Sequence, residues 1–133
     1  CRSAEAMGAN GIIIPEKGSA QINEVAIKAS AGAISNIHIC REKNLEKTIL
    51  IAKKSGLSII GCSEKSEKHV YQINLNTPAL IIIGSEKDGI STKLIKLIDE
   101  EIKIPIYGKT KSLNAAVAAG IVLFECIKQR NTN

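Results

Sequence analysis

Five short apolar runs constrain the fold of this 133-residue chain more strongly than any other feature. The run at residues 79–84, A-L-I-I-I-G, has no polar side, which is typical of a strand that is buried on both faces. Segments with helical patterning separate the runs. Strands that alternate with helices indicate an α/β fold with a mainly parallel sheet and helices on both faces. The expected strands are residues 11–15, 36–40, 57–61, 79–84 and 101–104.

The segments between these runs predict the helices. Gly8 and Gly56 are typical of residues that follow the last turn of a helix. The chain is long enough for one domain with a core, and its aromatic content of 2% predicts that aliphatic side chains fill this core. The expected helices are residues 2–8, 22–33, 45–55, 91–98 and 112–129, and residues 70–74 are expected to form a short extended piece.

Composition narrows the classes of partner and of site. The net charge of +5 suits a polyanionic partner, but no basic repeat interleaved with aromatics predicts a stacking platform for single strands. The four cysteines lie far apart without a C-x-x-C pair, and with only two histidines in the chain they predict free thiols and no metal site. No run is long enough to span a membrane, and a cytoplasmic location is expected.

Candidate ligand-binding residues follow the expected strands, because ligands of parallel sheets bind beyond the carboxyl ends of the strands. Residues 84–91, G-S-E-K-D-G-I-S, form a glycine-bounded acidic loop after the fourth strand. This loop superficially resembles a phosphate-binding loop, but Ile90 stands where such a loop carries a lysine, so a nucleoside triphosphate site is not expected. The alternative is a tight turn that needs glycine dihedral angles.

Residues 103–119 combine features that indicate a second ligand-binding segment. The I-P-I sequence at 104–106 resembles the end of a buried strand, and a polar loop, 107–111, follows it. Ser112 is expected to begin a helix that is apolar on all sides except for Asn114, which predicts burial on all sides. Free N–H groups in the first turn of this helix could bind an acceptor, or Ser112 and Asn114 could simply cap it.

Other polar residues have a structural interpretation beside a functional one. Arg2 is a lone arginine on a helix of small residues, which is usually a solvated group, and His38 and His69 have no partner in the sequence. Lysine-rich stretches are most often solvated faces. Lys109 and Lys111 are the exception, because they flank the expected ligand-binding loop.

Three stretches together resemble the SpoU-type RNA 2′-O-methyltransferases of the SPOUT superfamily. They are C-R-S-A-E-A-M-G-A-N-G-I-I-I-P at residues 1–15, A-L-I-I-I-G-S-E-K-D-G-I at 79–90 and I-P-I-Y-G-K-T-K-S-L-N-A-A-V-A at 104–118. G-S-A-Q-I-N at 18–23 and L-F-E-C-I-K-Q-R at 123–130 are similar to the branch that methylates a guanosine ribose in bacterial large-subunit ribosomal RNA. The resemblance implies that residues 1–133 are a catalytic domain with a C-terminal deep trefoil knot.

The resemblance also implies the residues of the site. Arg2 would take or share the proton of the ribose 2′-hydroxyl; because a guanidinium holds its own proton tightly, it would alternatively orient this hydroxyl and stabilise the developing oxyanion. Ser112 and Asn114 would position Arg2 and the hydroxyl, and Glu86 would connect the second motif to the first. The implied catalytic residues are thus Arg2, Glu86, Ser112 and Asn114. S-adenosylmethionine would bind within the knot, without a metal ion, against Gly61, Cys62, Gly84, Ile104, Ile106 and Leu113.

Partners are implied in the same way. Members of this family are homodimers whose C-terminal helices pack across a two-fold axis, which would cover the apolar helix on the side away from the sheet. They act on RNA, here ribosomal RNA, and a transfer-RNA ribose methyltransferase and a non-catalytic RNA-binding module are the alternatives. The family's first motif begins with an asparagine upstream of Arg2, and relatives carry an N-terminal RNA-binding domain, so further protein is expected to precede Cys1.

Overall fold

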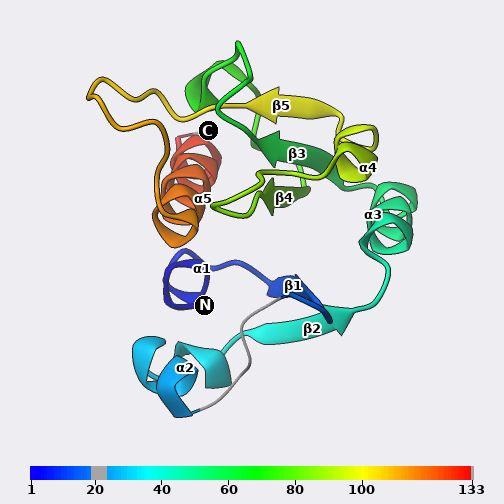
Figure 1. The fold of residues 1–133 in the computed structure, drawn as a ribbon, viewed down its shortest axis with the longest axis vertical. Coiled ribbons are helices and arrows are strands. Elements are labelled where there is room, and N and C mark those ends of the chain that lie inside the picture. The colour runs from blue at the N-terminus through cyan, green and yellow to red at the C-terminus, as the bar shows by residue number, and fades with distance from the viewer. Residues whose placement is uncertain (19–23, 133) are drawn as a thin grey trace. The chain divides into compact units, whose positions relative to one another are not determined.

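The computed structural model describes residues 1–18 and 24–132. They form two compact units, Cys1–Leu45 and Glu46–Asn133, each with its own parallel sheet (Figure 1). Parallel pairing agrees with the predicted fold class. In the part of the chain that the structure describes, however, the strands pair as one two-stranded and one three-stranded sheet.

The first unit contains two parallel strands that pair along their full length, from Gly11 opposite His38 to Pro15 opposite Glu42. Its first strand has the bounds that the sequence predicts. The elements of this unit are α1 (Arg2–Ala6), β1 (Gly11–Pro15), α2 (Glu24–Ala29), a 3-10 turn (Ala33–Ser35) and β2 (His38–Glu42).

Two predicted elements of this unit have different bounds in the structure. The strand predicted at residues 36–40 is β2 at His38–Glu42, because Asn36 still belongs to the preceding turn and its N–H donates to the Ala33 carbonyl at 2.9 Å. The helix predicted at residues 22–33 ends at Ala29, before Ala31 and Gly32 adopt positive φ angles of 52° and 83°. The start of that helix and residues 19–23 of the G-S-A-Q-I-N stretch lie outside the described residues.

The second unit is built on a three-stranded parallel sheet with the strand order β4-β3-β5. Its core is a cluster of Ile60, Val70, Leu75, Ile102, Val122 and Cys126. Full burial of an aliphatic side chain of this size contributes about 1.5–3 kcal/mol, so this cluster is a main source of stability. The elements are α3 (Leu45–Lys54), β3 (Ser58–Cys62), the 3-10 helix η2 (Val70–Gln72), β4 (Ala79–Ile83), α4 (Thr92–Ile95), β5 (Glu100–Ile102) and α5 (Ala115–Asn131).

Asp99 joins the start of β5 to the start of β3. Its backbone N–H donates to the Ile59 carbonyl at 2.8 Å, and its carboxylate accepts a hydrogen bond from the Ile59 N–H at 2.8 Å. The same carboxylate forms an ion pair with Lys53 of α3 at 2.8 Å. These contacts hold the pKa of Asp99 below its usual value, chiefly through Lys53 and then through the Ile59 N–H. The α4 helix ends at Ile95, short of the predicted residue 98.

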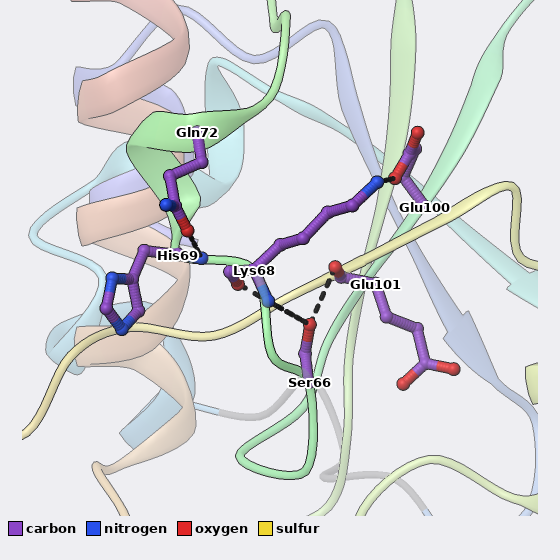
Figure 2. A network of polar contacts seen from close by, with 6 residues as sticks. All are labelled: Ser66, Lys68, His69, Gln72, Glu100 and Glu101. Atoms are coloured by element: carbon purple, nitrogen blue, oxygen red, sulfur yellow. Dashed lines mark hydrogen bonds and ion pairs between the residues drawn. The ribbon is translucent and has the colours of Figure 1, made fainter.

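A polar network fixes the point at which the chain leaves β5 (Figure 2). The hydroxyl of buried Ser66 donates to the Glu101 carbonyl at 2.8 Å and accepts from the Lys68 N–H at 3.2 Å, and the Lys68 ammonium pairs with Glu100 at 2.7 Å. The Lys103 N–H donates to the Lys68 carbonyl at 2.8 Å. The Lys103 carbonyl accepts from the Val70 N–H at 2.9 Å, so residues 66–70 lie alongside β5 and pair with the backbone of Lys103.

Two predictions for this region are wrong. Strand β5 ends at Ile102 and not at Ile104, because Lys103 pairs with the segment at Lys68 instead of continuing the ladder with β3. Residues 70–74 are not an extended piece, because Val70–Gln72 form a 3-10 helix. The Gln72 side chain accepts the His69 N–H at 2.6 Å and so caps this helix (Figure 2).

The C-terminal helix also differs from its prediction. It begins at Ala115, not at Ser112, because Asn114 is the capping residue. Burial on all sides is wrong within this chain, because α5 packs on β4 and η2 with one side and leaves Val117 and Phe124 exposed by 51% and 58%. That a second subunit covers the exposed side stays a prediction. Among the described residues, no helix is both long and apolar enough to cross a membrane.

We expect the Asp99 contacts to make stability depend on pH below about 4. Because folding lowers the pKa of Asp99, the ionised carboxylate contributes fully to the free energy of unfolding above the unfolded pKa of 3.8. This contribution is lost as the pH falls through the lower pKa of the folded state. Asp99→Asn should lower the free energy of unfolding by about 0.5–1 kcal/mol at pH 7, a small effect because solvent screens this exposed ion pair.

Urea unfolding of the wild type and Asp99→Asn between pH 7 and pH 3 measures this difference. The two proteins should converge as the pH falls below about 4. Glu67→Gln, at an exposed carboxylate for which the described residues provide no ion pair, serves as the control. A difference between wild type and Asp99→Asn that stays constant across the pH range would contradict the assignment.

Candidate functional site

The loop that follows β4 is a closed turn. The Ser85 N–H donates to the Gly89 carbonyl at 3.1 Å, and the Gly89 N–H donates to the Ser85 carbonyl at 2.9 Å. The Ser85 hydroxyl accepts from the Asp88 N–H at 3.0 Å, and Gly89 adopts a φ of +70°, which favours glycine. The tight turn that the sequence suggested is therefore present, with the glycine dihedral at its second glycine.

Gly84 is required for a different reason, a close approach of the backbone. A Cβ atom at Gly84 would lie 2.5 Å from the Gly89 carbonyl carbon and 2.7 Å from the Ile90 nitrogen. These are backbone atoms of the closed turn, which cannot move aside like a flexible side chain. Gly84 thus lets the two ends of the loop meet.

Glu86 and Asn114 are brought together, although they are 28 residues apart. The Asn114 Nδ2 donates to Glu86 Oε1 at 2.8 Å, and the Ala115 N–H donates to the same oxygen at 3.3 Å. A carboxylate at the first turn of α5 is also favoured by the helix dipole. The loop after β4 and the start of α5 are therefore fixed to each other through two of the residues singled out in the sequence.

Asn114 has a second role, as the cap of α5. Its Oδ1 accepts from the Ala116 N–H at 2.9 Å and from the Val117 N–H at 3.4 Å. Ser112 lies before the cap and is exposed, and its carbonyl accepts from the Thr110 hydroxyl at 3.3 Å. Of the two capping candidates in the sequence, Asn114 is correct and Ser112 is wrong.

The chain between β5 and α5 has no helix or strand at residues 104–113. Among the described residues, the backbone groups of this segment form no backbone–backbone hydrogen bond. Ile104, Ile106 and Leu113 are nevertheless half-buried, and Ile104 packs against the core. Backbone N–H and C=O groups that are not paired within the chain remain available as donors and acceptors for a ligand.

Gly61 and Cys62 lie at the carboxyl end of the central strand β3. A Cβ atom at Gly61 would overlap the terminal methyl group of Ile98 and lie 3.2 Å from that of Ile90, so these side chains would have to shift. Burial raises the pKa of the Cys62 thiol, and Glu64 adds to this effect. Cys62 therefore stays protonated at neutral pH, which makes it a poor nucleophile. Cys62 and the other three cysteines, Cys1, Cys40 and Cys126, are free.

Arg2 belongs to the other compact unit, where it is the first residue of α1 and is exposed.

His69 does have a partner, because its Nδ1 lies 2.7 Å from the Tyr71 hydroxyl. Tyr107, which was not among the residues singled out in the sequence, is 92% exposed. An aromatic residue inside a polar, lysine-containing loop was the available signal. Within residues 1–18 and 24–132, no group of three or more His, Cys, Asp and Glu side chains could hold a metal ion.

The comparison with known proteins assigns the chain to a family. The sequence profile of the SpoU rRNA methylase family matches residues 1–124. The chain belongs to the SpoU rRNA methylase family. The family resemblance of the sequence is thereby confirmed, and the parallel α/β architecture is shared with solved SpoU methyltransferases.

Relatives in this family are similar over nearly the whole chain. An uncharacterized tRNA/rRNA methyltransferase of Synechocystis sp. is 40% identical over 97% of the chain and 34% of the relative. The 23S rRNA (guanosine-2′-O-)-methyltransferase RlmB of Yersinia pestis is 34% identical over 97% of the chain and 52% of the relative. The chain thus spans about a third to a half of these proteins.

A solved SpoU structure has the same fold. The SpoU methyltransferase AviRb of Streptomyces viridochromogenes, in complex with the cofactor AdoMet, superposes with a TM-score of 0.89 at 28% identity. The match covers 99% of the chain and 52% of AviRb. The SpoU fold of the chain therefore rests on both sequence and structure.

We expect Gly84→Ala to destabilise the chain, because the new methyl group would press on the backbone of Gly89 and Ile90. The free energy of unfolding should fall by about 1–3 kcal/mol in urea titrations. Gly108→Ala is the matched control, because a Cβ atom there meets nothing within 4 Å, and its effect should stay within about 1 kcal/mol. Equal effects of the two substitutions would contradict the close-approach role of Gly84.

A double-mutant cycle should show coupling between Glu86 and Asn114. Glu86→Ala and Asn114→Ala together should cost less than the sum of the single effects by about 0.5–1.5 kcal/mol, because each single substitution already breaks their hydrogen bond. Urea unfolding of all four proteins measures this term. Asn114→Ser should restore the helix cap and not the coupling, and a coupling energy near zero would refute the link.

Proposed function

We propose that this chain is the catalytic domain of an S-adenosylmethionine-dependent RNA 2′-O-methyltransferase, with a guanosine ribose of large-subunit ribosomal RNA as the acceptor. Membership in the SpoU rRNA methylase family supports the reaction class. The Yersinia pestis relative, a 23S rRNA (guanosine-2′-O-)-methyltransferase, supports the acceptor. The chain spans 52% of the length of that relative.

The observation that carries this proposal is the segment at 104–113, whose half-buried residues have unpaired backbone groups within the described part of the chain. S-adenosylmethionine offers an adenine, a ribose and an amino acid that such groups can bind, and AviRb was solved with this cofactor. Bound S-adenosylmethionine supplies a methyl group activated on a sulfonium. The residues proposed to hold it are Gly61, Cys62, Gly84, Ile104, Ile106 and Leu113.

The proposed catalytic residues divide the remaining work. Arg2 would hold the ribose 2′-hydroxyl and stabilise the oxyanion that develops on it, since a guanidinium rarely accepts a proton. Ser112 and Asn114 would position this hydroxyl. Glu86 supports the arrangement, because its carboxylate fixes the Asn114 amide at 2.8 Å. Alignment of the hydroxyl with an activated donor is the main contribution that such a site makes.

Three further proposals accompany this function. The segment after β5 together with α5 would form the trefoil knot. The exposed apolar residues Val117, Ile121 and Phe124 recur at helical spacing on one side of α5, which suits packing against the same helix of a second copy. The protein would be cytoplasmic, as expected of an enzyme that modifies ribosomal RNA.

A transfer-RNA acceptor is the second candidate, because the Synechocystis relative is named a tRNA/rRNA methyltransferase. Transfer of a tritiated methyl group to unmodified large-subunit ribosomal RNA or to unmodified transfer RNA distinguishes the two. Label in ribosomal RNA alone supports the first candidate, and label in transfer RNA alone supports the second.

We expect the folded chain to bind S-adenosylmethionine with micromolar affinity in a calorimetric titration, which corresponds to about −8 kcal/mol. Arg2→Ala should retain this affinity and lose methyl transfer, because the proposed role of Arg2 concerns the hydroxyl. Arg2→Lys should recover only part of the rate, because an ammonium lacks the planar fork of a guanidinium.

Circular dichroism establishes that each protein is folded before the titration. A folded wild-type chain that binds neither S-adenosylmethionine nor S-adenosylhomocysteine would overturn the enzyme proposal in favour of a non-catalytic RNA-binding module. Loss of cofactor affinity in Arg2→Ala would overturn only the role given to Arg2.

A further inference from the structure

We infer that residues 107–111 form an RNA-contacting loop, in which Tyr107 stacks on a nucleobase and Lys109 and Lys111 contact phosphates. The inference rests on the proposed function, and it names side chains that position the RNA beside the reacting hydroxyl. None of the three residues belongs to the proposed catalytic or cofactor-binding set.

The exposure of Tyr107 is the first observation. Its side chain is 92% exposed, whereas Tyr71 is 50% exposed and its hydroxyl contacts His69 at 2.7 Å. The sequence contains only two tyrosines, one phenylalanine and no tryptophan. A ring that is almost wholly exposed to solvent contributes little to the stability of the fold. It is available for stacking on an unpaired base.

The charge of the loop is the second observation. From residue 103 to residue 124 the sequence contains three lysines and no aspartate or glutamate. Lys109 and Lys111 are exposed and form no ion pair with any described residue, whereas Lys53, Lys68 and Lys128 each do. Of the carboxylates on the neighbouring loop, that of Glu86 is held by Asn114 and Ala115. Asp88 on the same loop is the remaining acidic group there.

The position of the loop is the third observation. It starts after Ile106, which belongs to the half-buried segment proposed for the cofactor, and it ends at Lys111, immediately before Ser112. A nucleotide held by residues 107–111 therefore lies next to the residues proposed to position the 2′-hydroxyl.

RNA fits these three observations together. A single-stranded segment offers unstacked bases for the ring and phosphates for the lysines, and its ribose must be accessible for methylation. The sequence predicts no stacking platform because it lacks a basic repeat with aromatics. The single exposed ring of Tyr107, beside Lys109 and Lys111, would take the place of such a repeat.

The test uses the chain with a fluorescein-labelled single-stranded RNA 12-mer, read by fluorescence anisotropy at several salt concentrations. Tyr107→Ala should raise the Kd about five-fold or more, and Tyr107→Phe should restore it because the ring still stacks. The double variant Lys109→Ala/Lys111→Ala should raise the Kd at low salt about ten-fold. It should also reduce the slope of log Kd against log salt by about 1.4, the value for two phosphate contacts on a single strand.

Lys54→Ala/Lys96→Ala is the matched control. Both lysines are exposed, and they lie just before the amino ends of β3 and β5, at the opposite edge of the sheet from the loop. This control should bind RNA as the wild type does. All variants should bind S-adenosylmethionine as the wild type does in calorimetry, which shows that the fold and the cofactor site are intact.

The outcomes separate this inference from the proposed function. Loop variants that bind RNA like the wild type, or a wild type that binds no RNA, would overturn the inference and leave cofactor binding and transfer to stand. A wild type that binds RNA through the loop but no S-adenosylmethionine would support the inference and overturn the enzyme. Joint loss of RNA and cofactor binding in the loop variants would show a structural role instead.

Discussion

The pairing of β3 with both of its neighbours is the constraint on which the second unit depends. Its register places Cys62 opposite Ile83 of β4 and opposite Ile102 of β5, so the three strands end at one edge. Ile59 and Ile60 are 0% and 1% exposed, so β3 is buried on both faces, and the hydrogen bonds between Asp99 and Ile59 hold the start of β5 beside it. The loop after β4 and the segment after β5 thus begin side by side at one edge of the sheet.

The path of the chain after β5 determines which backbone groups are available at the candidate site. The Lys103 N–H donates to the Lys68 carbonyl, and the Lys103 carbonyl accepts from the Val70 N–H. The pairing of β5 with β3 therefore ends before Lys103, and the chain leaves the sheet. Pro105 follows too late to be the cause. Ile104 packs against the core, and among the described residues the backbone of residues 104–111 forms no hydrogen bond with other backbone groups, which leaves its donors and acceptors available to a ligand.

The sequence predicted much of this arrangement, and its failures have physical causes. Strand β1 and the parallel pairing follow from apolar runs, because burial on both faces leaves a clear pattern. The end of β5 and the 3-10 helix Val70–Gln72 depend on contacts between segments more than thirty residues apart, which no local pattern records. The start of α5 was misplaced because Ser112 and Asn114 are both good caps. The family resemblance implied a link from Glu86 to the first motif, whereas the hydrogen bond between Glu86 and Asn114 of the third motif is seen only in the fold.

The hydrogen bonds of Asn114 show why asparagine suits this position better than another capping residue. Aspartate could accept the N–H groups of the first turn as the Asn114 Oδ1 does but has no hydrogen to donate to Glu86, and serine offers a single, shorter hydroxyl for both contacts. Both ends of the side chain are therefore occupied, and the loop and the helix immobilise each other. Tyr107, Lys109 and Lys111 stay outside this network. Rigid residues would thus align the ribose, while side chains that keep their rotamer freedom would adapt to the variable path of the RNA.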